Sequence, residues 1–268
     1  FHAVSGFNNA GFIALKEEEG LAAFQSDGVV IGVLALLIFL GAISYGVIMD
    51  VVQHRRFKLF GLNTKLVLTF APILLMLGAG LFLLFEYSNP ETLGPLPVSQ
   101  KLTTSMFEAV NFTAGFSTID YAKAEQQTGF IMSGLMFIGG ASASVAGGIK
   151  INTLAVVIVA VVSTIRGRAH ASAYGREIPD EQVKRALTVG SISLAGVFLV
   201  VLLLTLSNTT FDFLSLVFES LSAFSTVGLS TGITSELSPW GHIILVVAMF
   251  VGRIGPFTIV IAMAQVSE

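Results

Sequence analysis

Apolar runs of membrane-spanning length dominate this chain, and they restrict the folds that are open to it. The sequence is 54% hydrophobic and 12% charged, whereas a typical soluble domain is about 25% charged. Five runs reach the ~20 residues that a helix needs to cross hydrocarbon, and they cover 28–53, 65–87, 128–165, 186–207 and 240–264. Because a bilayer offers backbone polar groups no water, we predict an all-α membrane protein with several spans.

Three short segments between these runs share one pattern. They read SGFNNAGF, NFTAGFST and FSTVGLST, and their glycines are Gly11, Gly115 and Gly228. An aromatic-rich stretch too short to span the membrane precedes each glycine, at about 1–7, 101–112 and 213–224. The repetition predicts tandem units of helix, pore helix, filter loop and helix around a central ion pore.

Loops of this kind suit cation coordination by the backbone. Glycine reaches backbone angles that other residues avoid, and carbonyl oxygens can replace the water shell of an ion. We expect the ion filter to consist of Asn9, Ala10, Gly11, Thr113, Ala114, Gly115, Thr226, Val227 and Gly228. The third triplet is nearly the core of potassium-channel filters. For a single loop, ordinary packing of small residues between membrane helices would be the better interpretation.

The order of elements divides the chain into repeats. We assign 1–64 to the second half of one repeat, 65–185 to a full repeat and 186–268 to another. Three loops cannot close a four-fold ring, and the chain begins with Phe1, not Met, inside the first repeated segment. We therefore expect the chain to be a fragment whose missing loop precedes Phe1.

The charges orient the predicted spans. With the filters placed outside, nine of the 14 Lys and Arg fall on the inner side: Arg55, Arg56, Lys58, Lys65, Arg166, Arg168, Arg176, Lys184 and Arg185. This bias predicts a multi-pass protein of the cell membrane with its filters facing outside. The outer side carries most of the acidic residues, including Glu17 to Glu19, Asp120, Glu125 and Asp212. They either concentrate cations in a vestibule or simply keep the outer loops soluble.

The run 128–165 is too long for one span. As a single helix its 38 residues would measure about 57 Å, against about 30 Å of hydrocarbon. Its middle reads GGASASVAGGIK, and we expect this segment to unwind and to form a gate beside the pore through Gly139, Gly140, Gly147, Gly148 and Lys150. Close packing of small residues is the alternative, but it does not explain the excess length.

Arg253 lies near the centre of the last apolar run, in the sequence GRIGP. A charge at that depth is costly and is a functional candidate by default. We expect Arg253 either to repel a cation or to hold the glycine-rich loop by donating to its carbonyls. Pairing with a lipid or a carboxylate is the alternative.

Enzyme chemistry has little support in this sequence. There is no cysteine, the four histidines lack metal-ligand spacing, and no nucleotide-binding fingerprint is present. An intramembrane enzyme would need a nucleophile beside a base, and the spans offer serines without one. We predict that the chain is not an enzyme and binds no nucleic acid.

Taken together, these features resemble the Trk/Ktr/HKT superfamily of potassium transporters, most closely the bacterial Ktr ion-translocating membrane subunit. The matching stretches are the SGFNNAGF segment, TAGF followed by ST-x-D, STVGLSTGIT, the glycine-rich break and GRIGP. The resemblance implies a potassium uptake subunit whose glycine-rich segment pairs with Arg253 in the closed pore. It leaves open whether potassium moves by symport with sodium as a second ion. One departure is that Phe112 stands where the family has Arg, in a pore-helix run one residue short.

The resemblance also implies partners. It predicts a homodimer in the membrane lipid and a cytosolic ring of regulatory subunits. Nucleotide would bind only to those subunits and not to this chain. A tandem potassium or non-selective cation channel without such a ring is the alternative.

Overall fold

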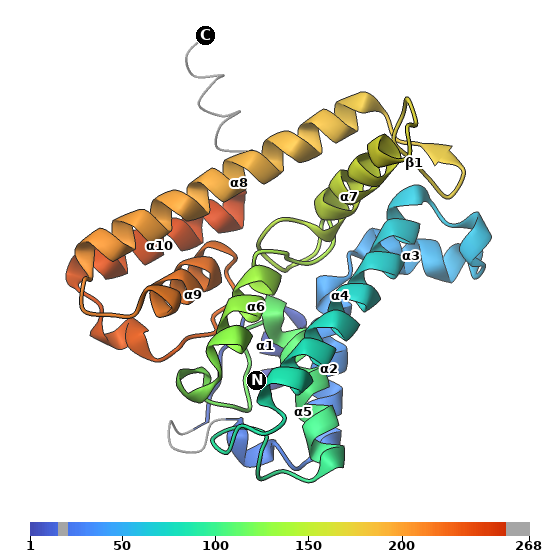
Figure 1. The fold of residues 1–268 in the computed structure, drawn as a ribbon. Coiled ribbons are helices and arrows are strands. Elements are labelled where there is room, and N and C mark those ends of the chain that lie inside the picture. The colour runs from blue at the N-terminus through green and yellow to red at the C-terminus, as the bar shows by residue number, and fades with distance from the viewer. Residues whose placement is uncertain (16–20, 256–268) are drawn as a thin grey trace.

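The computed structural model describes residues 1–15 and 21–255, and it is almost wholly helical (Figure 1). Its helices are α1 (His2–Phe7), α2 (Gly28–Ala42), α3 (Tyr45–His54), α4 (Leu62–Glu86), α5 (Val98–Val110), α6 (Gln126–Met136), α7 (Ile151–Ile165), α8 (Asp180–Ser207), α9 (Phe213–Phe224) and α10 (Pro239–Ile254). Single 3-10 turns cover Ala22–Phe24, Phe57–Leu59, Asn111–Thr113, Tyr121–Lys123 and Ile233–Glu236. A two-stranded antiparallel hairpin, which the sequence analysis did not predict, pairs β1 (Ser172–Ala173) with β2 (Arg176–Glu177).

Two helices are long and apolar enough to cross a membrane by themselves. They are α4, with 25 residues, and α8, with 28, and they confirm the predicted runs 65–87 and 186–207. Helix α10 accounts for the described part of the run 240–264, whose residues beyond 255 lie outside the described structure. In Figure 1, α8 and α10 lie side by side with α9 packed against them.

The prediction of one continuous span over 28–53 is wrong. Helices α2 and α3 meet at an angle of 94°, with Ile43 and Ser44 between them in extended conformations. Ser44 begins the new helix, because its hydroxyl accepts a hydrogen bond from the N–H of Val47 at 3.4 Å. The carbonyl of Ala42, left free by the bend, accepts instead from the N–H of Ala141 at 2.8 Å.

The predicted break in the run 128–165 is confirmed. Helix α6 ends at Met136, α7 begins at Ile151, and the residues between them are not helical. A backbone bridge closes this segment, with Gly139 N–H bonded to Ile149 O at 2.8 Å and Ile149 N–H bonded to Phe137 O at 3.0 Å. We call residues 139–150 the glycine loop.

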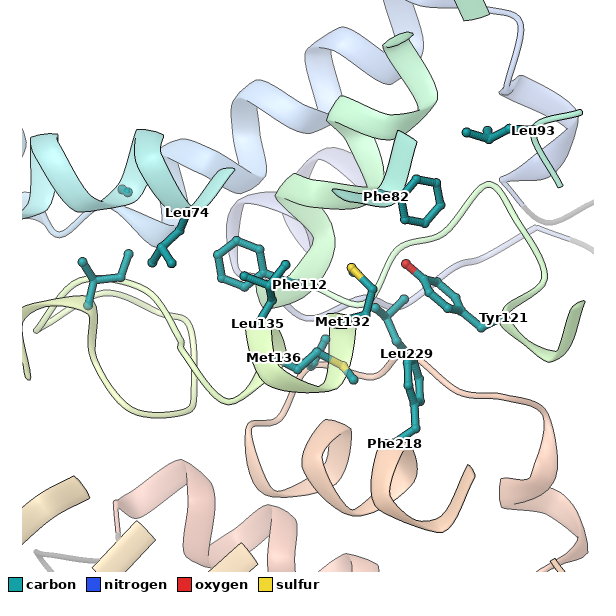
Figure 2. Close-up of a cluster of buried hydrophobic side chains, with 13 residues drawn as sticks. Leu74, Phe82, Leu93, Phe112, Tyr121, Met132, Leu135, Met136, Phe218 and Leu229 are labelled. Atoms are coloured by element: carbon teal, nitrogen blue, oxygen red, sulfur yellow. The ribbon is translucent and has the colours of Figure 1, made fainter. Parts of the chain in front are cut away.

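The largest apolar cluster of the described residues joins α4 and α6 to α9. Figure 2 shows Met132 and Met136 of α6 between Phe112, after α5, and Phe218 of α9. The Phe112 side chain is therefore a core residue. It lies in the 3-10 turn Asn111–Thr113, which directly follows α5.

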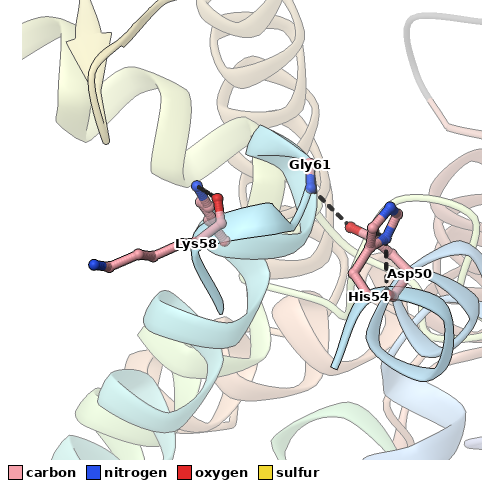
Figure 3. Close-up of polar contacts among 5 residues, drawn as sticks. Asp50, His54, Lys58 and Gly61 are labelled. Carbon is pink, nitrogen blue, oxygen red and sulfur yellow. Dashed lines mark hydrogen bonds and ion pairs between the residues drawn. The ribbon is translucent and has the colours of Figure 1, made fainter. Parts of the chain in front are cut away.

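The α3–α4 turn and the hairpin lie together at one end of the molecule, where the predicted inner basic residues are found (Figure 1). Figure 3 shows Asp50 bridging His54, at 2.7 Å, and the N–H of Gly61, at 2.9 Å. Lys65 donates to the Lys58 carbonyl at 2.9 Å, and its ammonium lies 5.9 Å from the ring centre of Tyr174 in the hairpin. These contacts fix the turn and the hairpin against each other.

Candidate functional site

The three glycine-containing loops, far apart in the sequence, meet in the structure. Thr113 of the second loop donates to the Asn9 side chain of the first at 2.7 Å. A methyl group built on Gly11 would lie 2.4 Å from the Ala114 carbonyl oxygen, and one built on Gly115 would lie 2.1 Å from that of Val227. The first loop therefore touches the second, and the second touches the third, at equivalent positions.

Glycine is required at the centre of each loop for a conformational reason. The φ angles of Gly11, Gly115 and Gly228 are 69°, 75° and 99°, in the region that side-chain-bearing residues rarely adopt. Two positions earlier, Asn9 and Thr226 also have positive φ, of 49° and 52°. For a β-branched residue such as Thr226 this is unusual, and such strain is concentrated at functional sites.

Buried oxygen atoms without partners gather before these glycines. Among the described residues, side-chain oxygens that are buried and not hydrogen-bonded occur on Ser5, Asn111, Ser225 and Thr226, as well as on Thr104 and Ser144. The first four lie two to six positions ahead of a loop glycine. A buried acceptor without a partner is unfavourable unless water or an ion satisfies it, so this region suits a cation with oxygen ligands.

A buried carboxylate behind each of the last two loops anchors the chain after the glycine. Glu108 accepts from the Thr118 N–H at 2.8 Å, and Glu219 accepts from the Thr231 N–H at 2.9 Å. Both side chains are at most 4% exposed, and both also bind the serine that follows the glycine by two. In the first loop, His2 accepts from the N–H of Ala14, which occupies the same position relative to its glycine.

These anchors were not predicted from the sequence, although the sequence holds a signal for them. The pair Phe-Glu occurs in both pore helices, and Ser-Thr follows both glycines by two. Neither carboxylate serves the predicted acidic vestibule, because both point into the protein. Asp120 and Asp212 cap the N-termini of the turn Tyr121–Lys123 and of α9, and Glu17 to Glu19 lie outside the described residues.

The glycine loop and Arg253 are brought together as predicted, although 108 positions separate the bonded residues. Arg253 donates through Nη1 to the Val145 carbonyl at 2.7 Å. Lys150 donates to the Ala146 carbonyl within the loop. Gly147 lies against the third repeated loop, since a methyl group there would sit 2.2 Å from both the Ser225 carbonyl oxygen and the Thr226 hydroxyl.

The other glycines of the loop allow close packing. A methyl group on Gly139 would lie 1.5 Å from the Gly147 carbonyl oxygen, and one on Gly140 would lie 2.6 Å from that of Ala42. Gly148 has a φ of 70°. The loop is therefore wedged between the end of α2, the third repeated loop and Arg253 of α10.

A cavity of about 470 Å³ lies between the first and third repeated loops. Its lining includes Asn9, Ala10, Thr226, Gly228 and Arg253. The first and third loops therefore face this open space, whereas the second loop contacts both of its neighbours.

Comparison with known proteins gives consistent matches along the whole chain. Residues 1–268 match the TrkH family, described as cation transport protein. The Ktr system potassium uptake protein B of Bacillus subtilis is 41% identical over 269 residues, which cover 100% of this chain and 60% of that protein. Its namesake from Vibrio alginolyticus is 37% identical over 99% of this chain and 58% of its own length. The potassium/sodium uptake protein NtpJ of Enterococcus hirae is 34% identical over 98% and 58%.

The fold also has a solved counterpart. The crystal structure of the potassium transporter TrkH from Vibrio parahaemolyticus matches with a TM-score of 0.76 at 17% sequence identity, over 97% of this chain and 57% of that one. At this identity the likeness concerns the fold alone. The chain spans about 60% of the length of the curated relatives that it matches.

Proposed function

The chain belongs to the TrkH family of cation transport proteins, and from this premise we propose that it is part of a potassium-translocating subunit of a Ktr- or Trk-type uptake system. The observation that carries the proposal is the direct contact of the three glycine loops. A fourth loop from the same longer protein would occupy the cavity between the first and third loops and complete the ring. The nine loop residues from Asn9 to Gly228 named above would then form the filter.

Potassium is the proposed substrate because of the chemistry of the loops. Backbone carbonyls in a ring replace the hydration shell of a weakly hydrated cation, and Thr226-Val227-Gly228 is nearly the triplet that potassium channels use. The names of the Bacillus and Vibrio relatives agree with this choice. Sodium remains a second ion to test, since the Enterococcus relative is named for both.

We place the repeats at 1–64, 65–185 and 186–268, with the filters outside and the hairpin inside. The inner placement follows from the basic residues around the α3–α4 turn and between α7 and α8. In this orientation the glycine loop lies on the inner side of the third filter loop. We assign it the role of a gate that Arg253 holds in place, because the Arg253–Val145 hydrogen bond ties the loop to α10.

Partners follow from the same family placement. A homodimer and a cytosolic ring of nucleotide-binding regulatory subunits are proposed for the full protein, by analogy with systems such as those of the relatives. The test is potassium uptake by a transport-deficient bacterial strain that expresses the full-length protein, with and without candidate regulatory subunits. Potassium uptake that is unchanged by every candidate regulatory subunit would favour a channel without a ring. A lack of any potassium uptake would contradict the proposal.

Replacing Glu219 with alanine should weaken the preference for potassium over sodium. The change removes the acceptor of the Ser230 hydroxyl and of the Thr231 N–H, at 2.6 and 2.9 Å, and frees the chain that follows Gly228. Hydrogen bonds to a charged group contribute about 1.5–3 kcal/mol each, so the loop would lose its fixed geometry. The measurement is potassium uptake in the presence of increasing sodium.

The matched control is Glu236→Ala, a carboxylate of the same repeat that is exposed. It should leave the selectivity unchanged. Equal selectivity of Glu219→Ala and the parent would remove Glu219 from the support of the filter.

A further inference from the structure

A second large cavity opens at the inner end of the molecule, away from the three filter loops. It measures about 790 Å³ and lies between the starts of α4, α7 and α8 and the β1–β2 hairpin. In Figure 1 the hairpin is seen between the end of α7 and the start of α8. None of the nine proposed filter residues lines this cavity, although Ser142 and Lys150 of the glycine loop do.

The lining of this inner cavity is positively charged. Lys150, Arg176 and Arg185 contribute to it from three different elements, the glycine loop, the hairpin and α8. Glu177 is the single carboxylate of its lining, and that carboxylate lies 3.2 Å from Nδ1 of His170. Basic side chains therefore outnumber carboxylates in the lining, a composition that suits an anion.

The remainder of the lining is of two kinds. Amide side chains come from Asn63, Asn152 and Gln182, and although Asn152 donates one hydrogen bond to the Asn63 oxygen, each amide group has two N–H donors and can also bind an anion's oxygens. Leu66, Val156 and Val189 provide an apolar wall. A small soluble anion would gain nothing from that wall, whereas an amphipathic ligand would use both parts.

We propose that this cavity binds the phosphate group of an anionic phospholipid from the inner leaflet. The phosphate lies among Lys150, Arg176 and Arg185, and the acyl chains run along Leu66 and Val156. Basic pockets between membrane helices on the cytoplasmic side are the sites where anionic headgroups bind. The apolar wall favours this ligand over free phosphate.

Lys150 connects the site to the glycine loop. Its ammonium donates to the Ala146 carbonyl inside the loop and has two further protons that a lipid phosphate can accept. Bound lipid would thus share Lys150 with the glycine loop and couple the site to the gate. This consequence rests on the proposed gate, but lipid binding itself does not.

The test compares two double variants of the full-length protein by native mass spectrometry with phosphatidylglycerol. Arg176→Gln with Arg185→Gln removes two charges from the cavity. Arg166→Gln with Lys184→Gln removes the same charge from positions on the same side of the protein that do not line the cavity. At about 1 kcal/mol for each basic residue, the first variant should bind the lipid at least ~10-fold more weakly, and the control should bind like the parent.

Two further experiments distinguish a lipid phosphate from free inorganic phosphate. Both use the parent protein, so they do not depend on whether a variant folds. Photoactivatable phosphatidylglycerol should label the parent protein on residues 150–156 and 176–189, and phosphatidylcholine should label them far less. Inorganic phosphate at millimolar concentration should not displace the lipid. Equal binding by both double variants, labelling confined to other segments, or displacement by inorganic phosphate would each overturn the proposal.

Discussion

Replacing Gly115 with alanine is expected to abolish most of the potassium selectivity of the full-length protein. Gly115 has a φ of 75°, and an added methyl group would lie 2.1 Å from the Val227 carbonyl oxygen. Because that distance is well inside van der Waals contact, one of the two loops must move. Overpacking of this kind costs about 1–3 kcal/mol, which corresponds to roughly 5- to 160-fold in selectivity if the whole cost falls on the preferred ion. Potassium uptake with sodium as competitor measures the effect.

Substitutions of two other glycines provide comparisons for the loss of selectivity expected from Gly115→Ala. Gly228 has a φ of 99° but its added methyl would lie 3.9 Å from the Gly115 Cα, so Gly228→Ala or Gly228→Ser should reduce selectivity through strain with less steric conflict. Gly134 of α6 has no atom within 4 Å of an added methyl, and Gly134→Ala should leave selectivity unchanged. If Gly115→Ala discriminated between the ions as well as the parent, the second loop would have no place in a filter.

Replacing Arg253 with alanine is expected to raise ion flux while selectivity stays unchanged. The guanidinium donates to the Val145 carbonyl at 2.7 Å, and a hydrogen bond from a charged donor contributes about 1.5–3 kcal/mol. Its loss shifts the loop towards an open arrangement by about 10- to 160-fold, since each ~1.4 kcal/mol is a factor of ten. The measurement is potassium flux into liposomes that contain the full-length protein.

Deletion of residues 141–147 should raise flux at least as much, because it removes the obstruction itself. Arg166→Ala, which changes an exposed arginine on the same side of the protein as the hairpin, is the control and should conduct like the parent. Correct assembly is verified by size-exclusion chromatography. A well-assembled Arg253→Ala protein that conducts no faster than the parent would refute the role of the loop as a gate.

The glycine loop and its contact with Arg253 could be predicted because their signals are local. An apolar run of excess length with clustered glycines must break somewhere, and an arginine within an apolar run requires acceptors, which an unwound segment supplies. The three repeated glycines were recognisable for a similar reason. Each stands at a position where positive φ excludes other residues.

The bend between α2 and α3 could not be predicted in this way. The run 28–53 is mostly apolar, and its one local signal is Ser44, which caps α3. The bend also involves a distant partner, because the carbonyl of Ala42 accepts from the N–H of Ala141 in the glycine loop. The anchoring roles of Glu108 and Glu219 were missed for a related reason. Composition groups them with acidic outer residues, whereas the fold buries both of them behind the loops.

The central claim is that the three loops, completed by a fourth, form one ion-binding ring. The most direct test is a crystal structure of the full-length protein grown with Rb⁺ in place of K⁺, examined by anomalous scattering. The account predicts an anomalous peak on the shared axis of the loops, coordinated by carbonyl oxygens next to Gly11, Gly115 and Gly228, and lost in the Gly115→Ala protein. A Rb⁺ peak elsewhere, with none between the loops, would contradict the account.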